Sequence, residues 1–119
     1  MCLKSIKTTP DIAQEDIVCY KIVNFNYKSP YYSLEYSVNT TYINNMESEI
    51  TSYGDGVKVG GGYYHTFKET ESVVKYLETR GSFNRRTHLL RCIIPKGTEY
   101  YQNEFEYASR ALKVIEEVC

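Results

Sequence analysis

The chain has 119 residues, of which 24% are charged and 42% hydrophobic, and its formal net charge is −1. We expect this length to form one domain, residues 1–119, and the composition excludes a disordered or collagen-like chain. The balanced charge excludes a general nucleic-acid binder, which carries a basic excess. Tyrosine is over-represented, with 13 Tyr against 4 Phe and no Trp.

The N-terminus lacks the apolar segment of a secretory signal, and no run of about 18 apolar residues occurs that could span a membrane. The four cysteines, at positions 2, 19, 92 and 119, include no closely spaced pair that could hold zinc. Cys19 and Cys92 lie in apolar stretches, where a reduced cysteine acts as a small hydrophobic residue. We therefore expect a cytoplasmic protein without a membrane segment, a metal or a cofactor.

The first half of the chain predicts strands. Residues 1–16 are polar, and Ile17–Phe25 has the composition of a buried strand that ends before Pro30. Apolar residues alternate over 32–38, which predicts a half-buried strand, and residues 41–43 extend or follow it. The polar stretch 44–52 predicts no element.

The centre of the chain predicts a turn, a short strand and a helix. Gly54-Asp55-Gly56 is a strong turn signal before a strand over 57–59. Thr66 and Glu69 have the spacing of a capping box, and Val73, Val74 and Leu77 follow at helical spacing. We predict a helix over 69–80, which ends at Gly81.

The last third begins with a strand over 89–94, closed by Pro95-Lys96-Gly97. Tyr100 and Tyr101 start a polar connection. For residues 105–118 both helical spacing and strand alternation occur, with the helical pattern the better local match.

Three glycines, 60–62, are followed by Tyr63, Tyr64 and His65. Glycine allows a backbone to approach a ligand closely, and the three rings can stack on a base or bond to a ribose. No Lys-Ser/Thr pair follows, so this segment is not a P-loop. The alternative is a bulge or bend at a strand end that requires small residues.

The interval between Glu78 and Glu99 holds no acidic residue but contains Arg80, Arg85, Arg86, Arg91 and Lys96. Guanidinium groups bind phosphates and carboxylates with paired hydrogen bonds, so Arg85, Arg86 and Arg91 are candidate ligand-binding residues. The alternative is a solvated basic loop.

We assign no catalytic residue. Cys92 adjoins Arg91, but neighbours in a strand point to opposite faces, so the arginine does not activate the thiol. Glu104 and Glu106 could form an acid–base pair on one side of an extended segment, or two exposed acids in a loop. Tyrosine doublets at 31–32, 63–64 and 100–101 suit an interface or a ligand pocket, a homo-oligomer included, or a tyrosine-rich core.

Three segments together resemble a group of small accessory proteins from tailed phages and prophages of gut bacteria. They are Ile17-Val18-Cys19-Tyr20-Lys21, Tyr64-His65-Thr66-Phe67, and Ile93 to Tyr101 with Tyr107-Ala108-Ser109. The resemblance implies that the Pro-Lys-Gly turn and the last segment are paired strands. It also implies a role against host defence, either by sequestering a nucleotide-derived signal or by binding a defence protein.

We expect an α+β fold, a mainly antiparallel, curved sheet with one helix packed on it. The leading hypothesis is a non-enzymatic phage protein that binds a nucleotide-like immune signal in the host cytoplasm. One alternative is a protein inhibitor of a host defence protein. Another is an enzyme, since Glu104-Phe105-Glu106 resembles the Glu-x-Glu of arginine-directed ADP-ribosyltransferases, although a Ser-Thr-Ser strand is missing and the chain is short for that fold.

Overall fold

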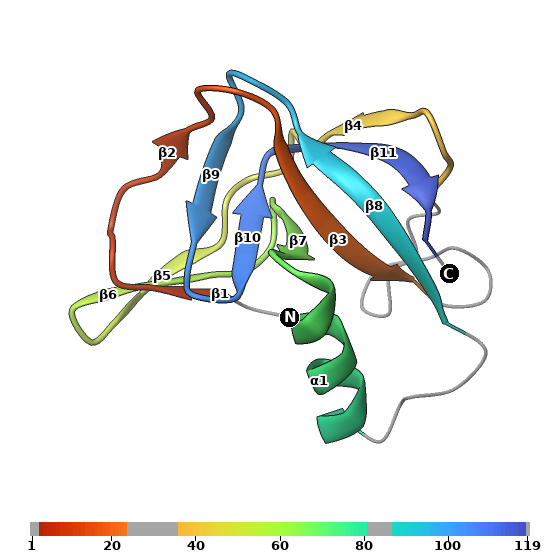
Figure 1. Cartoon of the computed structure of the whole chain (residues 1–119). Helices are drawn as coiled ribbons and strands as arrows, with labels where there is room; N and C mark the ends of the chain where they lie inside the picture. The colour runs from red at the N-terminus through yellow and green to blue at the C-terminus, as the bar shows by residue number, and fades with distance from the viewer. Residues whose placement is uncertain (1–2, 24–35, 81–86, 119) are drawn as a thin grey trace.

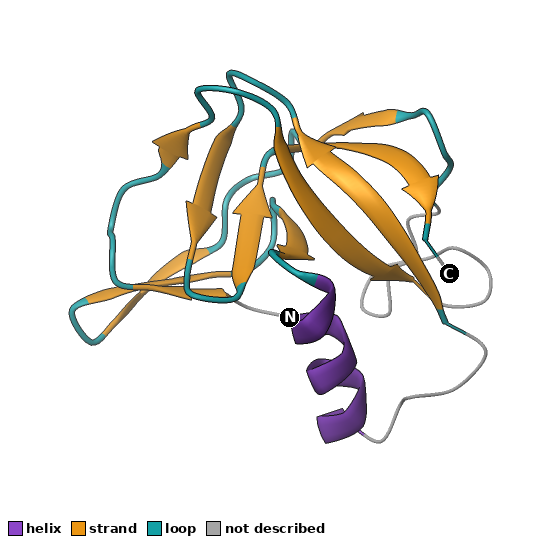
Figure 2. Cartoon of the chain, in the orientation of Figure 1, coloured by secondary structure: helices purple, strands orange, loops and turns teal. Residues whose placement is uncertain are grey.

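The computed structural model describes residues 3–23, 36–80 and 87–118 (Figure 1). The described elements form an eight-stranded sheet, a three-stranded sheet and the helix α1 (Thr70–Arg80), and every strand pairing is antiparallel (Figure 2). The expected α+β class is therefore confirmed, as is a helix at the predicted position.

The eight-stranded sheet is built around β3 and β8, which pair over seven consecutive residues from Ile17 opposite Ile94 to Val23 opposite His88. Both are apolar segments that the sequence predicts as strands. In spatial order the sheet is β2 (Asp11–Ile12), β9 (Glu99–Gln102), β10 (Glu106–Ser109), β7 (Tyr64–Phe67), β3 (Ile17–Val23), β8 (His88–Ile94), β11 (Ala111–Glu117) and β4 (Thr41–Ile43).

The small sheet has the order β1 (Leu3–Ser5), β6 (Gly56–Val59), β5 (Ile50–Tyr53). Its hairpin turns at Gly54-Asp55, where Tyr53 faces Gly56 and Gly54 has a φ of 56°. A two-residue hairpin turn needs positive φ, which glycine adopts without strain. The predicted turn and the strand after it are confirmed.

Alternation along the strands gives the large sheet two buried faces. One face carries a core that includes Cys19, Leu90, Cys92, Leu112 and Val114. On the other face, the small sheet packs against β9 and β10, and α1 packs against β7 and β3. Leu3 and Val59 meet Tyr101 and Ala108 in the first of these contacts, and Val73 meets Ile22 and Phe67 in the second.

Several local predictions are wrong. The polar stretch 44–52 contains the start of β5, and Tyr100 and Tyr101 belong to β9 rather than to a connection. Residues 36–38, the described part of the strand expected over 32–38, form no strand. Thr66 is buried inside β7, so the predicted capping box at the start of α1 does not form.

The last segment is two strands, β10 and β11, rather than the helix that its local spacing favours. β10 lies between β9 and β7, and β11 lies between β8 and β4, so both strands are paired on both edges. Tertiary pairing therefore outweighs a local helical pattern, because each strand gains ladder hydrogen bonds and burial that an isolated helix would lack.

Arg110 fastens the glycine segment to the loop before β5. Its Nη1 donates to the carbonyl oxygens of Met46 and Gly62, each at 2.7 Å, and its Nη2 donates to Ser48 Oγ. Gly62 has a φ of 87°, and a Cβ there would lie 2.8 Å from the carbonyl oxygen of Glu47. The glycines thus let the backbone approach the chain's own loop. This corresponds to the second interpretation of the segment, a bend that requires small residues, rather than to an approach to a ligand.

Replacing Gly62 by alanine should destabilise the protein by about 2 kcal/mol or more, because the left-handed backbone and the crowding act together. Gly54→Ala is the matched control: Gly54 also has positive φ, but nothing lies within 4 Å of its added Cβ. Urea unfolding of both variants measures the difference. Equal losses of stability would show that the contact with the loop contributes nothing.

Candidate functional site

The rings predicted to stack on a ligand are all buried. Tyr63, Tyr64 and His65 have exposed fractions of 5%, 8% and 7%. The Tyr63 hydroxyl donates to Glu99 Oε2 at 3.1 Å, and His65 Nε2 donates to the Gly60 carbonyl at 2.9 Å. Burial lowers the pKa of His65 to about 4, so its ring is neutral at pH 7.

The predicted arginines are not brought to these rings within the described residues. Arg91 lies on β8, separated from β7 by β3, and it donates to Glu116. Arg85 and Arg86 lie outside the described residues. The assignment of these side chains to a ligand site stays a prediction.

The interior beside β7 contains a buried lysine. Lys21 is 7% exposed, its Nζ donates to the His65 carbonyl at 2.9 Å, and it lies 5.5 Å from the centre of the Tyr36 ring. Burial lowers the pKa of Lys21 to about 8.

The two described cysteines, Cys19 and Cys92, face each other across β3 and β8 and are fully buried. Burial raises the pKa of Cys19 to about 12, and it raises the pKa of Cys92 above its usual range. Only a thiolate is a good nucleophile, so neither residue is suited to covalent catalysis. This agrees with the structural role that the sequence predicts for them.

The burial of Lys21 gives a pH-dependent prediction. The folded pKa of about 8 lies below the ordinary value of 10.5, so the unfolded state holds the proton more tightly. The contribution of this lysine to stability therefore rises as the pH increases through this interval. Relative to Lys21→Met, the wild-type protein should gain on the order of 3 kcal/mol between these two pH values.

Urea unfolding of both proteins across this pH range measures the effect. The comparison with Lys21→Met is necessary because the raised pKa of Cys19 has the opposite effect. Above about pH 9 it lowers the stability of both proteins as the pH increases. A constant stability difference over the whole range would contradict a buried, destabilised ammonium group.

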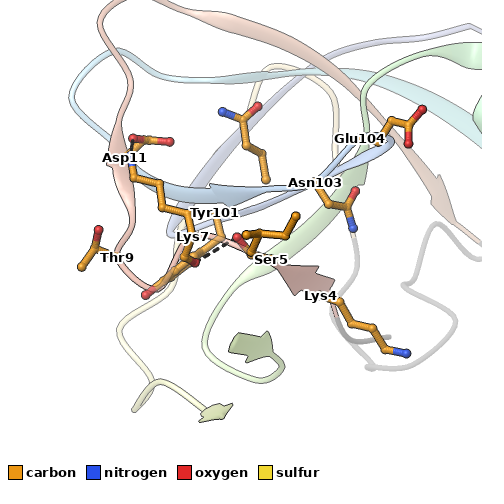
Figure 3. A pocket seen from close by; sticks show the side chains of 10 residues that line it. Lys4, Ser5, Lys7, Thr9, Asp11, Tyr101, Asn103 and Glu104 are labelled. Atoms are coloured by element: carbon orange, nitrogen blue, oxygen red, sulfur yellow. Dashed lines mark hydrogen bonds and ion pairs between the residues drawn. The ribbon is translucent and has the colours of Figure 1, made fainter. Parts of the chain in front are cut away.

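A cavity of about 470 Å³ lies between β1, the connection to β2, and the end of β9; we refer to it as the β1–β9 cavity (Figure 3). It is lined by Lys4, Ser5, Ile6, Lys7, Thr9, Asp11, Tyr101, Gln102, Asn103 and Glu104. Tyr101 is 4% exposed and belongs to the core under the small sheet, whereas Ile6 is 89% exposed. The cavity thus lies between a buried strand residue and an exposed loop residue.

The cavity forms because the pairing of β2 with β9 is short. Asp11 lies opposite Tyr100 and Ile12 opposite Glu99, and the pairing then stops. Continuing the same register would place Thr9 opposite Gln102, but Thr9 lies in a bend and lines the cavity instead. The chain between β1 and β2 therefore leaves the end of β9 uncovered on this side.

The polar groups of the cavity carry both signs of charge. Lys7 donates to Asp11, and this hydrogen bond is the main cause that lowers the pKa of the Asp11 carboxyl. Lys4 donates to the Tyr53 hydroxyl at 3.1 Å, and Lys68 donates to Gln102 Oε1 at 2.8 Å. The Lys4 ammonium is therefore directed to Tyr53, outside the lining, and Figure 3 shows it pointing away from Lys7 and Asp11. With the Lys7 ammonium and two carboxylate groups, the cavity can donate to an anion and accept from hydroxyl groups.

Of the cavity residues, sequence reasoning singles out Glu104 as a possible acid–base group and Tyr101 as a member of a tyrosine doublet suited to a pocket or an interface. The partner of Glu104 in that hypothesis, Glu106, is not among the lining residues but lies on β10 opposite Phe67, where burial raises the pKa of its carboxyl. The lysines and Gln102 carry no sequence signal, because the loop after β1 brings them together rather than a motif or a periodic pattern.

No family model, curated protein or solved structure matches this chain. Among the described residues, no helix has the length and apolar character needed to cross a membrane. Within the same residues, no group of three or more His, Cys, Asp or Glu side chains is arranged to hold a metal ion.

Proposed function

We propose that the chain is a non-enzymatic binding protein that holds a nucleotide-derived signalling molecule of a bacterial host in the β1–β9 cavity. The observation that carries this proposal is the cavity itself, which combines the Lys7 ammonium, two carboxylates and amide groups at one open site. Its volume of about 470 Å³ is in the range of small-molecule sites.

Each kind of group in the cavity suits one part of a nucleotide. Lys7 provides an ammonium group that binds phosphate. Asp11 and Glu104 provide carboxylate oxygens that accept hydrogen bonds from ribose hydroxyls, a recurrent mode of ribose recognition. The proposal assigns contact to these residues rather than to Tyr63–His65, because those side chains are buried.

The resemblance to phage accessory proteins supports a role in sequestering such a signal in the cytoplasm of an infected cell. A strongly curved sheet is part of the proposal. It is supported by Tyr42 of β4 and Tyr64 of β7, whose ring centroids are 6.5 Å apart although their strands are four places apart in the sheet order. Such curvature encloses the core on one face and leaves the other face free to hold the small sheet that borders the cavity.

A second candidate function is inhibition of a host defence protein by direct contact. It is favoured by apolar side chains around the edge strand β4: Val38, Ile43 and Met46 are 46%, 67% and 65% exposed. Exposed apolar side chains beside a strand edge are typical of protein interfaces. A stable complex with one host protein, lost on Ile43→Asp but not on Lys7→Ala, would favour this function over nucleotide binding.

The proposed function predicts that Lys7→Ala weakens binding of adenosine 5′-monophosphate about tenfold, because it removes the charged partner of the phosphate. Lys113→Ala is the control, since Lys113 is exposed on β11, five strands away from β9 in the sheet. Calorimetric titration of the wild type and both variants measures the effect. Equal effects of Lys113→Ala and Lys7→Ala on binding, or no binding by the wild type, would contradict the proposal.

The enzyme alternative is tested on the same protein. Glu106→Gln should leave nucleotide binding unchanged, since Glu106 is outside the cavity lining. Incubation with NAD should show no consumption by either protein. NAD consumption by the wild type that Glu106→Gln abolishes would replace the binding function with an ADP-ribosyltransferase activity.

A further inference from the structure

The backbone of β9 turns its hydrogen-bonding groups alternately to its two sides. Arg110 N–H donates to the Glu99 carbonyl, and Asn103 N–H donates to the Glu106 carbonyl. Glu99 and Asn103 therefore direct their backbone groups towards β10. Because the direction alternates along a strand, Tyr100 and Gln102 direct theirs to the opposite side.

On that opposite side only part of β9 is covered. Tyr100 lies opposite Asp11, and the pairing continues in the other direction, where Ala13 N–H donates to the Thr98 carbonyl at 2.9 Å. Gln102 is the next residue of β9 after Tyr100 whose backbone groups face away from β10, and it lines the β1–β9 cavity. Among the backbone hydrogen bonds of the described residues outside regular ladders, none involves the N–H or the C=O of Gln102.

The side chain of Gln102 is engaged elsewhere. Its Oε1 accepts from Lys68 at 2.8 Å, and the side chain also hydrogen-bonds to the Asp11 carboxyl. The groups that Gln102 offers to a ligand are consequently its backbone donor and its backbone acceptor. In an antiparallel strand these two groups of one residue point the same way and normally bind one residue of a neighbouring strand.

We propose that the backbone N–H and C=O of Gln102 bind the nucleobase of the ligand, reading one edge that has an acceptor next to a donor. This inference rests on the proposed function and specifies how the same cavity recognises its ligand. The adenine edge with N1 as acceptor and N6–H as donor has the required pattern, and so does the uracil edge with O4 and N3–H.

The arrangement divides recognition between two sets of groups. Lys7, from the loop after β1, binds the phosphate, and the strand edge of β9 binds the base. A base bound in this way takes the place that a further residue of β2 would occupy if the pairing continued past Asp11. An unpaired strand edge is otherwise a hazard for aggregation, which a bound ligand would relieve.

The test separates the backbone from the side chain. Gln102→Ala removes the side chain and keeps the N–H, whereas Gln102→Pro also removes the N–H. Proline is tolerated on a strand edge whose N–H faces away from the sheet. We expect Gln102→Ala to bind adenosine 5′-monophosphate within about threefold of wild type, and Gln102→Pro to bind it roughly tenfold more weakly than Gln102→Ala.

Changes in the ligand provide an arm that does not depend on any variant folding. Purine riboside 5′-monophosphate, which lacks the N6 donor, and N1-methyladenosine 5′-monophosphate, whose acceptor is blocked, should each bind the wild type roughly tenfold more weakly than adenosine 5′-monophosphate. Uridine 5′-monophosphate should also bind. Its N3-methyl derivative, which lacks the N3–H donor, should bind roughly tenfold more weakly than uridine 5′-monophosphate. Ribose 5-phosphate should bind the wild type and both variants equally.

The outcomes distinguish the two levels of the argument. If the wild type binds none of these nucleotides nor ribose 5-phosphate, the proposed function itself is wrong. If it binds the nucleotides but does not discriminate against the modified bases, the nucleobase inference is overturned while the proposed function stands. Equal affinities of a folded Gln102→Pro and Gln102→Ala would likewise overturn it.

Discussion

The antiparallel pairing of β3 with β8 is the constraint on which the rest of the structure depends. Seven consecutive residue pairs fix which side chains of each strand enter the core and which face the helix side. Through Tyr20 opposite Phe67 the same register passes to β7, then to β10 and to β9. A shift by one residue anywhere in this series would exchange the two faces and turn the backbone groups of Gln102 away from the cavity.

The strand β9 is fixed by side-chain contacts near its start, whereas its end borders the cavity. Near its start, Glu99 accepts from the Tyr63 hydroxyl and lies 3.6 Å from Arg110 Nε, and Arg110 also holds the loop before β5. At its end, Gln102 borders the β1–β9 cavity. A binding group on a strand fixed in this way loses little conformational entropy when a ligand binds, which favours affinity.

Sequence reasoning succeeds where the pattern is local. β3, β8, the turn at Gly54 and α1 follow from apolar runs, glycine and helical spacing within a single segment. β9 and β10 do not, because Tyr100, Tyr101 and the acidic residues after them gain strand structure only from partners far away in the chain. The cavity is beyond prediction for the same reason: its residues meet because the register of β2 against β9 ends at Asp11.

The central claim is that the β1–β9 cavity holds a nucleotide-derived molecule of the host cell. Native mass spectrometry of the protein isolated from the bacterial host that the proposal assigns to it, with analysis of the small molecules released on denaturation, tests it most directly. The account predicts one phosphate-bearing nucleotide per chain, depleted in a Lys7→Ala variant. A bound molecule without phosphate or base, or a stoichiometric host protein in place of any small molecule, would contradict it.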